Sequence, residues 1–134
     1  MKFNAMPRFA AALLLAAIVG SAPAHAEEAR SVNVKQAQLM KGQGALLLDV
    51  READEYASGH APGSVLIPLG QLDKRLKEIE GFQNKPVVLI CRSGRRSAAA
   101  AEILRKAGFT DARNVDGGMM AWEKAGLPTV QGMK

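Results

Sequence analysis

The only cysteine of this chain stands at the end of an apolar run, directly before a loop rich in arginine. The run is Val87-Val88-Leu89-Ile90, and the loop continues from Cys91 as Arg92-Ser93-Gly94-Arg95-Arg96-Ser97. β-Branched apolar residues, then glycine, then an alanine-rich stretch predict a buried strand, a short loop and a helix. Loop amides and a helix start carry partial positive charge, which lowers a thiol pKa and attracts anions. The pattern therefore indicates thiolate chemistry on an anionic substrate.

Each position of this loop has an expected role. Cys91 is the candidate nucleophile, and no general base lies beside it in the sequence, so loop amides, the helix start and guanidinium groups have to stabilise the thiolate. We expect Arg96 to fix the loop and Arg92 and Arg95 to face solvent, where they attract an oxyanion. Ser97 either caps the helix or donates to the sulfur, and capping is favoured. The predicted substrate-binding residues are Arg92, Ser93, Gly94, Arg95, Arg96 and Ser97.

Polar residues outside the loop have more ordinary interpretations. Asp49 ends an apolar run and Arg51 follows it, so the two are expected to support the site as a structural ion pair rather than as catalytic groups. His60 lies between breakers in Gly59-His60-Ala61-Pro62-Gly63, which predicts a loop histidine bonded to backbone rather than a general base. Trp122 is expected to pack the last helix onto the domain.

The first 26 residues have the pattern of a secretory signal peptide. Lys2 and Arg8 precede the apolar stretch 9–19, which is short for a membrane span, and Ala24-His25-Ala26 offers a cleavage site before Glu27. We therefore expect a cleaved signal at 1–26, a single domain over 27–134, and a periplasmic location, with full secretion and an uncleaved anchor as alternatives. His60 would then be the single remaining histidine, so a histidine-rich metal site is not predicted. No cofactor is expected.

The charge of the expected mature chain is too small to indicate nucleic-acid binding. Removal of Lys2 and Arg8 from 18 basic residues leaves 16 against 13 acidic ones, a net charge of +3 instead of +5. No basic run is interleaved with aromatic residues. Three arginines between positions 92 and 96 concentrate the excess locally, which favours a small anion as partner. No membrane contact is expected after signal cleavage.

The remaining pattern predicts an α/β fold. Short apolar strands are expected at 31–34, 45–50, 64–68, 86–90 and 112–115, and helical segments at 35–41, 51–58, 69–79, 96–107 and 119–125. This alternation is typical of a mainly parallel sheet with helices on both faces. Ligands of such sheets bind beyond the carboxyl ends of the strands, where Asp49, Cys91 and Asp116 are placed.

Several segments resemble the rhodanese family of sulfurtransferases, in its single-domain secreted form. They are Asp49-Val50-Arg51-Glu52, Glu55 to Ser64, Ile67-Pro68, Cys91 to Ser97, Asp116-Gly117-Gly118-Met119, Ala121-Trp122 and Ala125-Gly126-Leu127-Pro128. The resemblance implies a five-stranded parallel sheet flanked by helices. It also implies that Cys91 takes the outer sulfur of thiosulfate, releases sulfite, and passes the sulfur from a persulfide to a thiophilic acceptor such as cyanide or a thiol.

Other functions share parts of this pattern. Cysteine-dependent phosphatases and arsenate reductases place one residue more between cysteine and arginine than the four that separate Cys91 from Arg96. A thiol oxidoreductase normally needs a resolving cysteine, which this chain lacks. A relay that passes the persulfide sulfur to a partner protein uses the same cysteine and stays open. The sequence does not choose among physiological donors and acceptors or define the oligomeric state.

Overall fold

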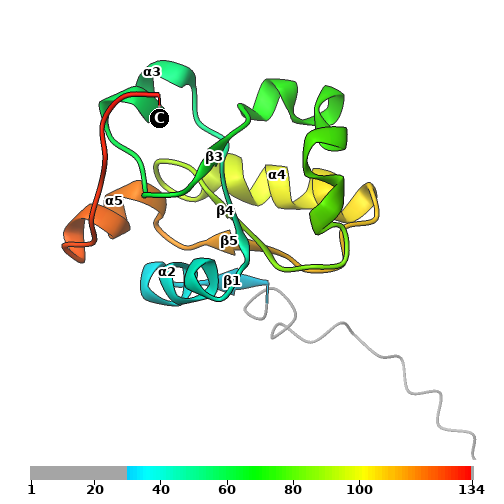
Figure 1. Cartoon of the computed structure of the whole chain (residues 1–134), viewed down its shortest axis with the longest axis horizontal. Helices are drawn as coiled ribbons and strands as arrows, with labels where there is room; N and C mark the ends of the chain where they lie inside the picture. The colour runs from blue at the N-terminus through cyan, green and yellow to red at the C-terminus, as the bar shows by residue number, and fades with distance from the viewer. Residues whose placement is uncertain (1–29, 134) are drawn as a thin grey trace, which may run out of the picture.

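The computed structural model describes residues 30–133, which form alternating strands and helices (Figure 1). The strands are β1 (Ser31–Val32), β2 (Leu46–Asp49), β3 (Val65–Leu66), β4 (Val87–Ile90) and β5 (Ala112–Val115). The α-helices are α2 (Val34–Gly42), α3 (Ala53–Ser58), α4 (Arg95–Lys106) and α5 (Gly118–Lys124), and the 3₁₀ helices are η1 (Leu69–Lys74) and η2 (Leu76–Phe82). The expected signal peptide lies outside the described residues.

The strands form one parallel sheet in the order β1-β5-β4-β2-β3, which confirms the predicted architecture. Asp49 at the end of β2 pairs with Ile90 at the end of β4, and Leu89 pairs with Asn114 of β5. The carboxyl ends of these three neighbouring strands therefore meet at one edge of the sheet. Cys91 follows β4 directly at that edge.

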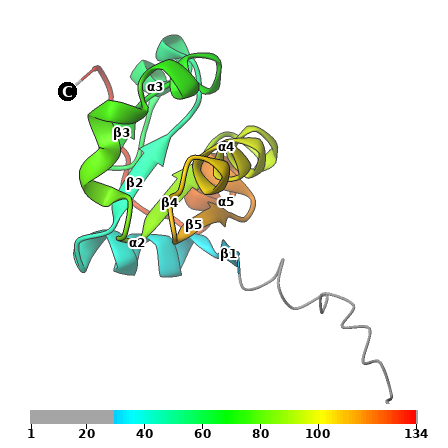
Figure 2. The same cartoon turned by 90° about the vertical axis from the view of Figure 1, so that its right-hand side faces the viewer.

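Helices cover both faces of the sheet, as Figures 1 and 2 show with α4 and α2 on opposite sides of the strands. Leu48 and Leu89 point into a core that α4, η1 and η2 complete, whereas Leu47 and Val88 point into a second core against α2 and α5. All four side chains are fully buried. Successive strand residues face opposite sides, so a sheet covered twice needs the uninterrupted apolar runs seen in the sequence.

The segment predicted as one helix over 69–79 is instead two 3₁₀ helices. Leu69 and Leu72 are three residues apart, as are Leu76 and Ile79, and this spacing suits the three residues per turn of a 3₁₀ helix. Arg75, between the two helices, has a non-helical backbone (φ −117°, ψ 13°). The break falls in the four-residue step from Leu72 to Leu76, so the apolar side chains still face the core.

The first strand is shorter than predicted because Asn33 starts a helix. The Asn33 side chain accepts a hydrogen bond from the Gln36 amide at 2.8 Å, and the Gln36 side chain accepts one from the Asn33 amide at 2.9 Å. This reciprocal capping box stops β1 at Val32 and begins α2 at Val34.

Among residues 30–133, no helix has the length and apolar character needed to cross a membrane.

Candidate active site

Cys91 lies at the bottom of the loop between β4 and α4, and only 1% of the residue is exposed. The Gly94 amide donates a hydrogen bond to Cys91 Sγ at 3.1 Å, and the Ser97 hydroxyl lies 3.3 Å from the same sulfur. Gly94 has a left-handed backbone (φ 102°), which turns the chain back over the sulfur and leads into α4. The loop therefore surrounds one sulfur atom with donors.

These donors favour the ionised form of the thiol. Burial by itself raises the pKa of Cys91, but the hydroxyl of Ser97 and the amides of Ser97, Gly94 and Ser93 outweigh it, and the net pKa lies below the ordinary value of 9.0. Hydrogen bonds to a thiolate stabilise its charge without a neighbouring base. The sequence prediction of an amide-lined sulfur thus agrees with the geometry.

Ser97 does not act as the helix cap that the sequence favours. Gly94 occupies the N-cap position of α4 and makes no side-chain cap bond, so Ser97 lies inside the first turn. Its buried hydroxyl faces Cys91 Sγ and also lies 2.6 Å from Asn114 Oδ1 of β5. The sequence analysis does not single out Asn114. A polar residue at the end of a strand that borders β4 is the available signal for it.

The start of α5 fixes the backbone of the cysteine loop from the other side. The Met119 amide donates to Cys91 O at 2.8 Å, and the Met120 amide donates to Arg92 O at 3.1 Å. Gly118 has a positive φ of 54°, and a Cβ there would lie 2.3 Å from Cys91 O. This close approach requires glycine, which explains the second glycine of Asp116-Gly117-Gly118.

The three loop arginines have different environments. Arg96 is half-buried and forms a two-point ion pair with Glu55 of α3, at 2.6 and 2.9 Å. Arg92 and Arg95 are exposed, and neither has an ion-pair partner within residues 30–133. Arg96 thus joins α4 to α3, as expected of the residue that fixes the loop, and the other two guanidinium groups are accessible to anions.

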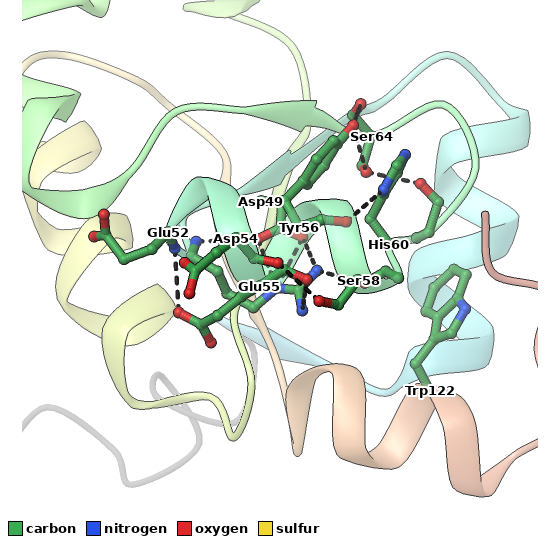
Figure 3. Close-up of polar contacts among 12 residues, drawn as sticks. Asp49, Glu52, Asp54, Glu55, Tyr56, Ser58, His60, Ser64 and Trp122 are labelled. Carbon is green, nitrogen blue, oxygen red and sulfur yellow. Dashed lines mark hydrogen bonds and ion pairs between the residues drawn. The ribbon is translucent and has the colours of Figure 1, made fainter. Parts of the chain in front are cut away.

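A buried ion pair supports α3, in agreement with the structural interpretation of Asp49 and Arg51. Arg51 Nη2 lies 2.8 Å from Asp49 Oδ2, and Arg51 also donates to Glu55 O at 3.3 Å and to Gly59 O at 2.9 Å. Asp49 is fully buried and Arg51 is 6% exposed. Figure 3 shows these contacts gathered around α3. They fix the helix that presents Glu55 to Arg96, a connection that the sequence analysis does not identify.

His60 has the backbone contact predicted for it. Its Nδ1 lies 2.8 Å from Tyr56 O, and its ring stacks on the Tyr56 ring with centroids 3.6 Å apart. Trp122 is 2% exposed and donates from Nε1 to Pro128 O at 2.9 Å, which holds α5 and the following segment together. Figure 3 shows the His60 contact with the Tyr56 backbone, and Trp122 belongs to the second core.

A small polar hollow lies beside the cysteine loop. Its volume is about 300 Å³, and Arg92, Glu55, Asp54, Ser58 and Glu123 are among its lining residues. This size and polarity suit small hydrophilic molecules.

Within the described part of the chain, no cluster of three or more His, Cys, Asp or Glu side chains is arranged to hold a metal ion.

The sequence is similar to one family model and to several known proteins. The family model described as rhodanese-like domain matches residues 33–125. A thiosulfate sulfurtransferase, GlpE, of Pseudomonas savastanoi is 37% identical over 107 residues, which cover 78% of this chain and 98% of GlpE. A putative sulfur carrier protein, YrkF, of Bacillus subtilis is 47% identical over 76 residues, 57% of this chain and 40% of YrkF.

A solved structure has the same fold. The crystal structure of a rhodanese-related protein from Thermoplasma volcanium superposes with a TM-score of 0.68 at 35% identity, over 75% of this chain and 97% of that one. Against three of the curated relatives that it matches, this chain spans 40%, 51% and 60% of their length.

Proposed function

The chain belongs to the rhodanese family of sulfurtransferases, and on that premise we propose that Cys91 takes a sulfane sulfur from thiosulfate and transfers it to a thiophilic acceptor. The name of the GlpE relative, thiosulfate sulfurtransferase, supports thiosulfate as donor. The observation that supports the proposal most is the ring of donors on Cys91 Sγ, from Gly94 and Ser97. Such donors stabilise the thiolate that attacks the sulfur donor.

The reaction has two steps that conserve charge. The Cys91 thiolate attacks the outer sulfur of thiosulfate, a new S–S bond forms, and sulfite leaves with the electron pair of the old bond. The acceptor, cyanide or a thiolate, then attacks the terminal sulfur of the persulfide, and Cys91 leaves as the thiolate. The products of this step are thiocyanate or an acceptor persulfide. Neither step needs a proton donor, in keeping with a site that stabilises anions rather than one built on a base.

Arg92 and Arg95 are proposed to bind the donor. Both are exposed and lack ion-pair partners in the described region, whereas Arg96 is already paired with Glu55. A guanidinium fork matches the geometry of the sulfonate oxygens of thiosulfate. Arg92 also lines the small polar hollow beside the loop.

A sulfur relay to a partner protein is the second candidate. YrkF, named as a putative sulfur carrier protein, supports this alternative. The same persulfide forms in a relay, and the acceptor is then a thiol on another protein. Phosphate-ester or arsenate chemistry is less well supported, because the loop is one residue shorter than the phosphatase loop and closes tightly around a single atom.

An assay with several substrates tests the sulfur donor and separates sulfur transfer from phosphate-ester hydrolysis. The purified protein and the Cys91→Ser variant are incubated with cyanide and either thiosulfate or polysulfide, and thiocyanate is measured. In a separate incubation with a phosphate ester, free phosphate is measured. We expect the natural protein, but not the Cys91→Ser variant, to form thiocyanate from thiosulfate and cyanide. We expect neither protein to release phosphate. Turnover of polysulfide without turnover of thiosulfate would contradict the donor proposed here, and phosphate release that depends on Cys91 would contradict the reaction class.

We also propose that the chain acts in the periplasm after removal of residues 1–26. The pattern of Lys2, Arg8, an apolar stretch and Ala24-His25-Ala26 supports this proposal. Expression of the full chain in a Gram-negative bacterium, followed by fractionation and N-terminal sequencing, provides the test. We expect a periplasmic product that begins at Glu27, and a cytoplasmic product that keeps Met1 would contradict it.

A further inference from the structure

Asn114 occupies a position from which it controls a hydrogen bond to the reactive sulfur. It lies in β5 between two strands, paired with Leu89 on one side and Ser31 on the other, so its backbone is firmly held. Its Oδ1 lies 2.6 Å from Ser97 Oγ, and Ser97 Oγ lies 3.3 Å from Cys91 Sγ. The three side chains form a chain of contacts from the sheet to the sulfur.

The hydroxyl of Ser97 has a single proton and two neighbours that compete for it. In the arrangement of the structure the shorter contact is to Asn114 Oδ1, and an amide oxygen can only accept. The hydroxyl lies within donating distance of both acceptors and can donate to only one of them at a time. When it donates to Asn114, the oxygen of Ser97 presents lone pairs to Cys91. This arrangement suits a neutral thiol, whose S–H donates to Ser97, but it repels a thiolate.

An asparagine side chain can reverse this chain of hydrogen bonds. A half-turn about its Cβ–Cγ bond places Nδ2 where Oδ1 was, and the amide then donates to Ser97 Oγ. The Ser97 proton is released toward Cys91 and donates to the negative sulfur. The amide lies beside Gly94, where even an added Cβ would be at the ordinary contact distance of 3.6 Å from Nδ2.

We propose that Asn114 is a positioning residue that turns its amide with the charge on Cys91, so that Ser97 donates to the sulfur in the thiolate and accepts from it in the thiol. The inference rests on the proposed function, because it concerns the same reactive sulfur. Arg30, Glu102 and Arg105 are charged residues that line a surface hollow together with Asn114. The other charged groups near this edge of the sheet are Arg92, Arg95 and Arg96 of the loop and α4, Asp116 after β5, the Asp49–Arg51 pair after β2, and Glu52 and Glu55 at α3.

The test compares one substitution in two backgrounds. Asn114→Asp keeps the shape of the side chain but leaves only acceptors, so it holds the Ser97 proton away from the sulfur. Asn114→Asp is made in the natural chain and in the Ser97→Ala variant, and the rate of iodoacetamide alkylation is measured across pH. Ultraviolet absorbance of the thiolate is followed in parallel as a readout that does not depend on access. Cys91 is the only cysteine, so both signals report on it alone.

With Ser97 present, we expect Asn114→Asp to lower the alkylation rate at neutral pH by about tenfold, the effect of losing one hydrogen bond to a charged group. In the Ser97→Ala background, the same substitution leaves only the effect of a nearby charge, and we expect a loss of less than about threefold. Equal losses in the two backgrounds would show that Asn114 acts by charge alone and would overturn the proposal, as would no loss with Ser97.

A neutral variant keeps the test valid if Asn114→Asp prevents folding. Asn114→Ala removes donor and acceptor without adding charge, and the proposal requires a change of alkylation rate with Ser97 present and none in the Ser97→Ala background. An equal change in both backgrounds would overturn it. Alkylation needs no sulfur donor, so loss of this coupling with intact sulfur transfer rejects the inference alone. Intact coupling without sulfur transfer rejects the proposed function alone.

Discussion

At the scale of single residues, the site depends on dipoles around one sulfur rather than on an acid–base pair. Cys91 receives a hydrogen bond from the Gly94 amide and contacts the Ser97 hydroxyl, and these groups lower its pKa against the opposing effect of burial. A thiol with a lowered pKa is ionised at a lower pH than an ordinary cysteine. The residues that hold the loop in place therefore matter as much as the cysteine itself.

Gly118 is one of these residues, and its replacement is expected to disrupt the loop. A Cβ at this position would lie 2.3 Å from Cys91 O and 2.7 Å from Arg92 O, both backbone atoms that cannot move freely. We expect Gly118→Ala to lower the free energy of unfolding by at least about 2 kcal/mol and to reduce sulfur transfer. Urea denaturation and thiocyanate formation measure the two effects.

Gly126 provides the matched control for that substitution. It has a similar positive φ of 71°, but a Cβ there meets no atom within 4 Å. Gly126→Ala should cost only the backbone strain, about 1 kcal/mol, and leave sulfur transfer unchanged. Equal effects of the two substitutions would mean that the contact of Gly118 with the cysteine loop is unimportant.

The exposed arginines are expected to act on substrate binding. Because Arg92 and Arg95 lack ion-pair partners in the described residues, replacement of both by alanine should raise KM for thiosulfate about threefold to tenfold with a smaller change in kcat. Steady-state kinetics at low and moderate salt measure this effect. Arg75→Ala, which removes an exposed arginine paired with Glu78, is the control. An unchanged KM in the double variant would exclude the two guanidinium groups from donor binding.

At the scale of elements, the ion pair between α3 and α4 connects the cysteine loop to its neighbour. The bidentate ion pair with Arg96 lowers the pKa of Glu55 from 4.5 to about 2, against an opposing effect of burial. Arg51 contributes from the other side, because it binds Asp49 and the carbonyls of Glu55 and Gly59 at once. The loop is thereby joined to the end of β2 through α3.

This pair predicts a specific dependence of stability on pH. The pKa of Glu55 is lower in the folded state, so its contribution is fully present above about pH 4.5 and is lost as pH falls toward 2. Near neutral pH we expect Glu55→Gln to lower the free energy of unfolding by about 1 kcal/mol, a modest value because both partners are partly exposed. Urea titrations of both proteins between pH 7 and pH 2 provide the measurement. A difference that persists at the acid end would contradict this role.

The sequence predicts the type of most elements but not how they end. The apolar runs of β2 and β4 identify buried parallel strands, because both faces of the sheet are covered. The break at Arg75 and the capping box of Asn33 are decided by local spacing and side-chain bonds that a coarse periodicity does not resolve. Long-range partners such as Glu55–Arg96 and Ser97–Asn114 depend on the strand order, which the sequence analysis does not define.

At the scale of the whole molecule, the segment after α5 closes the domain over α3. It runs from α5 toward α3 in Figure 1, and Val130 exchanges two backbone hydrogen bonds with His60, each 2.9 Å. The Gly132 amide adds a bond to Ala57 O at 2.8 Å. These contacts connect the last part of the described chain to the helix that holds Glu55.

Removal of this segment should loosen the domain. A chain that ends at Pro128 keeps the contact of Trp122 and loses three backbone hydrogen bonds, so we expect a loss of about 2 to 4 kcal/mol in the free energy of unfolding. The control is Val130→Ala, which keeps the two backbone hydrogen bonds of residue 130. Because the Val130 side chain is partly exposed, this substitution should lower the free energy of unfolding by less than about 1 kcal/mol. An unchanged urea midpoint in the shortened chain would contradict a structural role.

The measurement that tests the central claim most directly is the intact mass of the protein through one cycle of sulfur transfer. The intact masses of the protein and its Cys91→Ser variant are measured before treatment, after incubation with thiosulfate, and after subsequent incubation with cyanide. We predict a gain of one sulfur atom, about 32 Da, that cyanide removes and that the variant never shows. No gain by a protein whose Cys91 thiol still titrates would contradict transfer of thiosulfate sulfur through this cysteine.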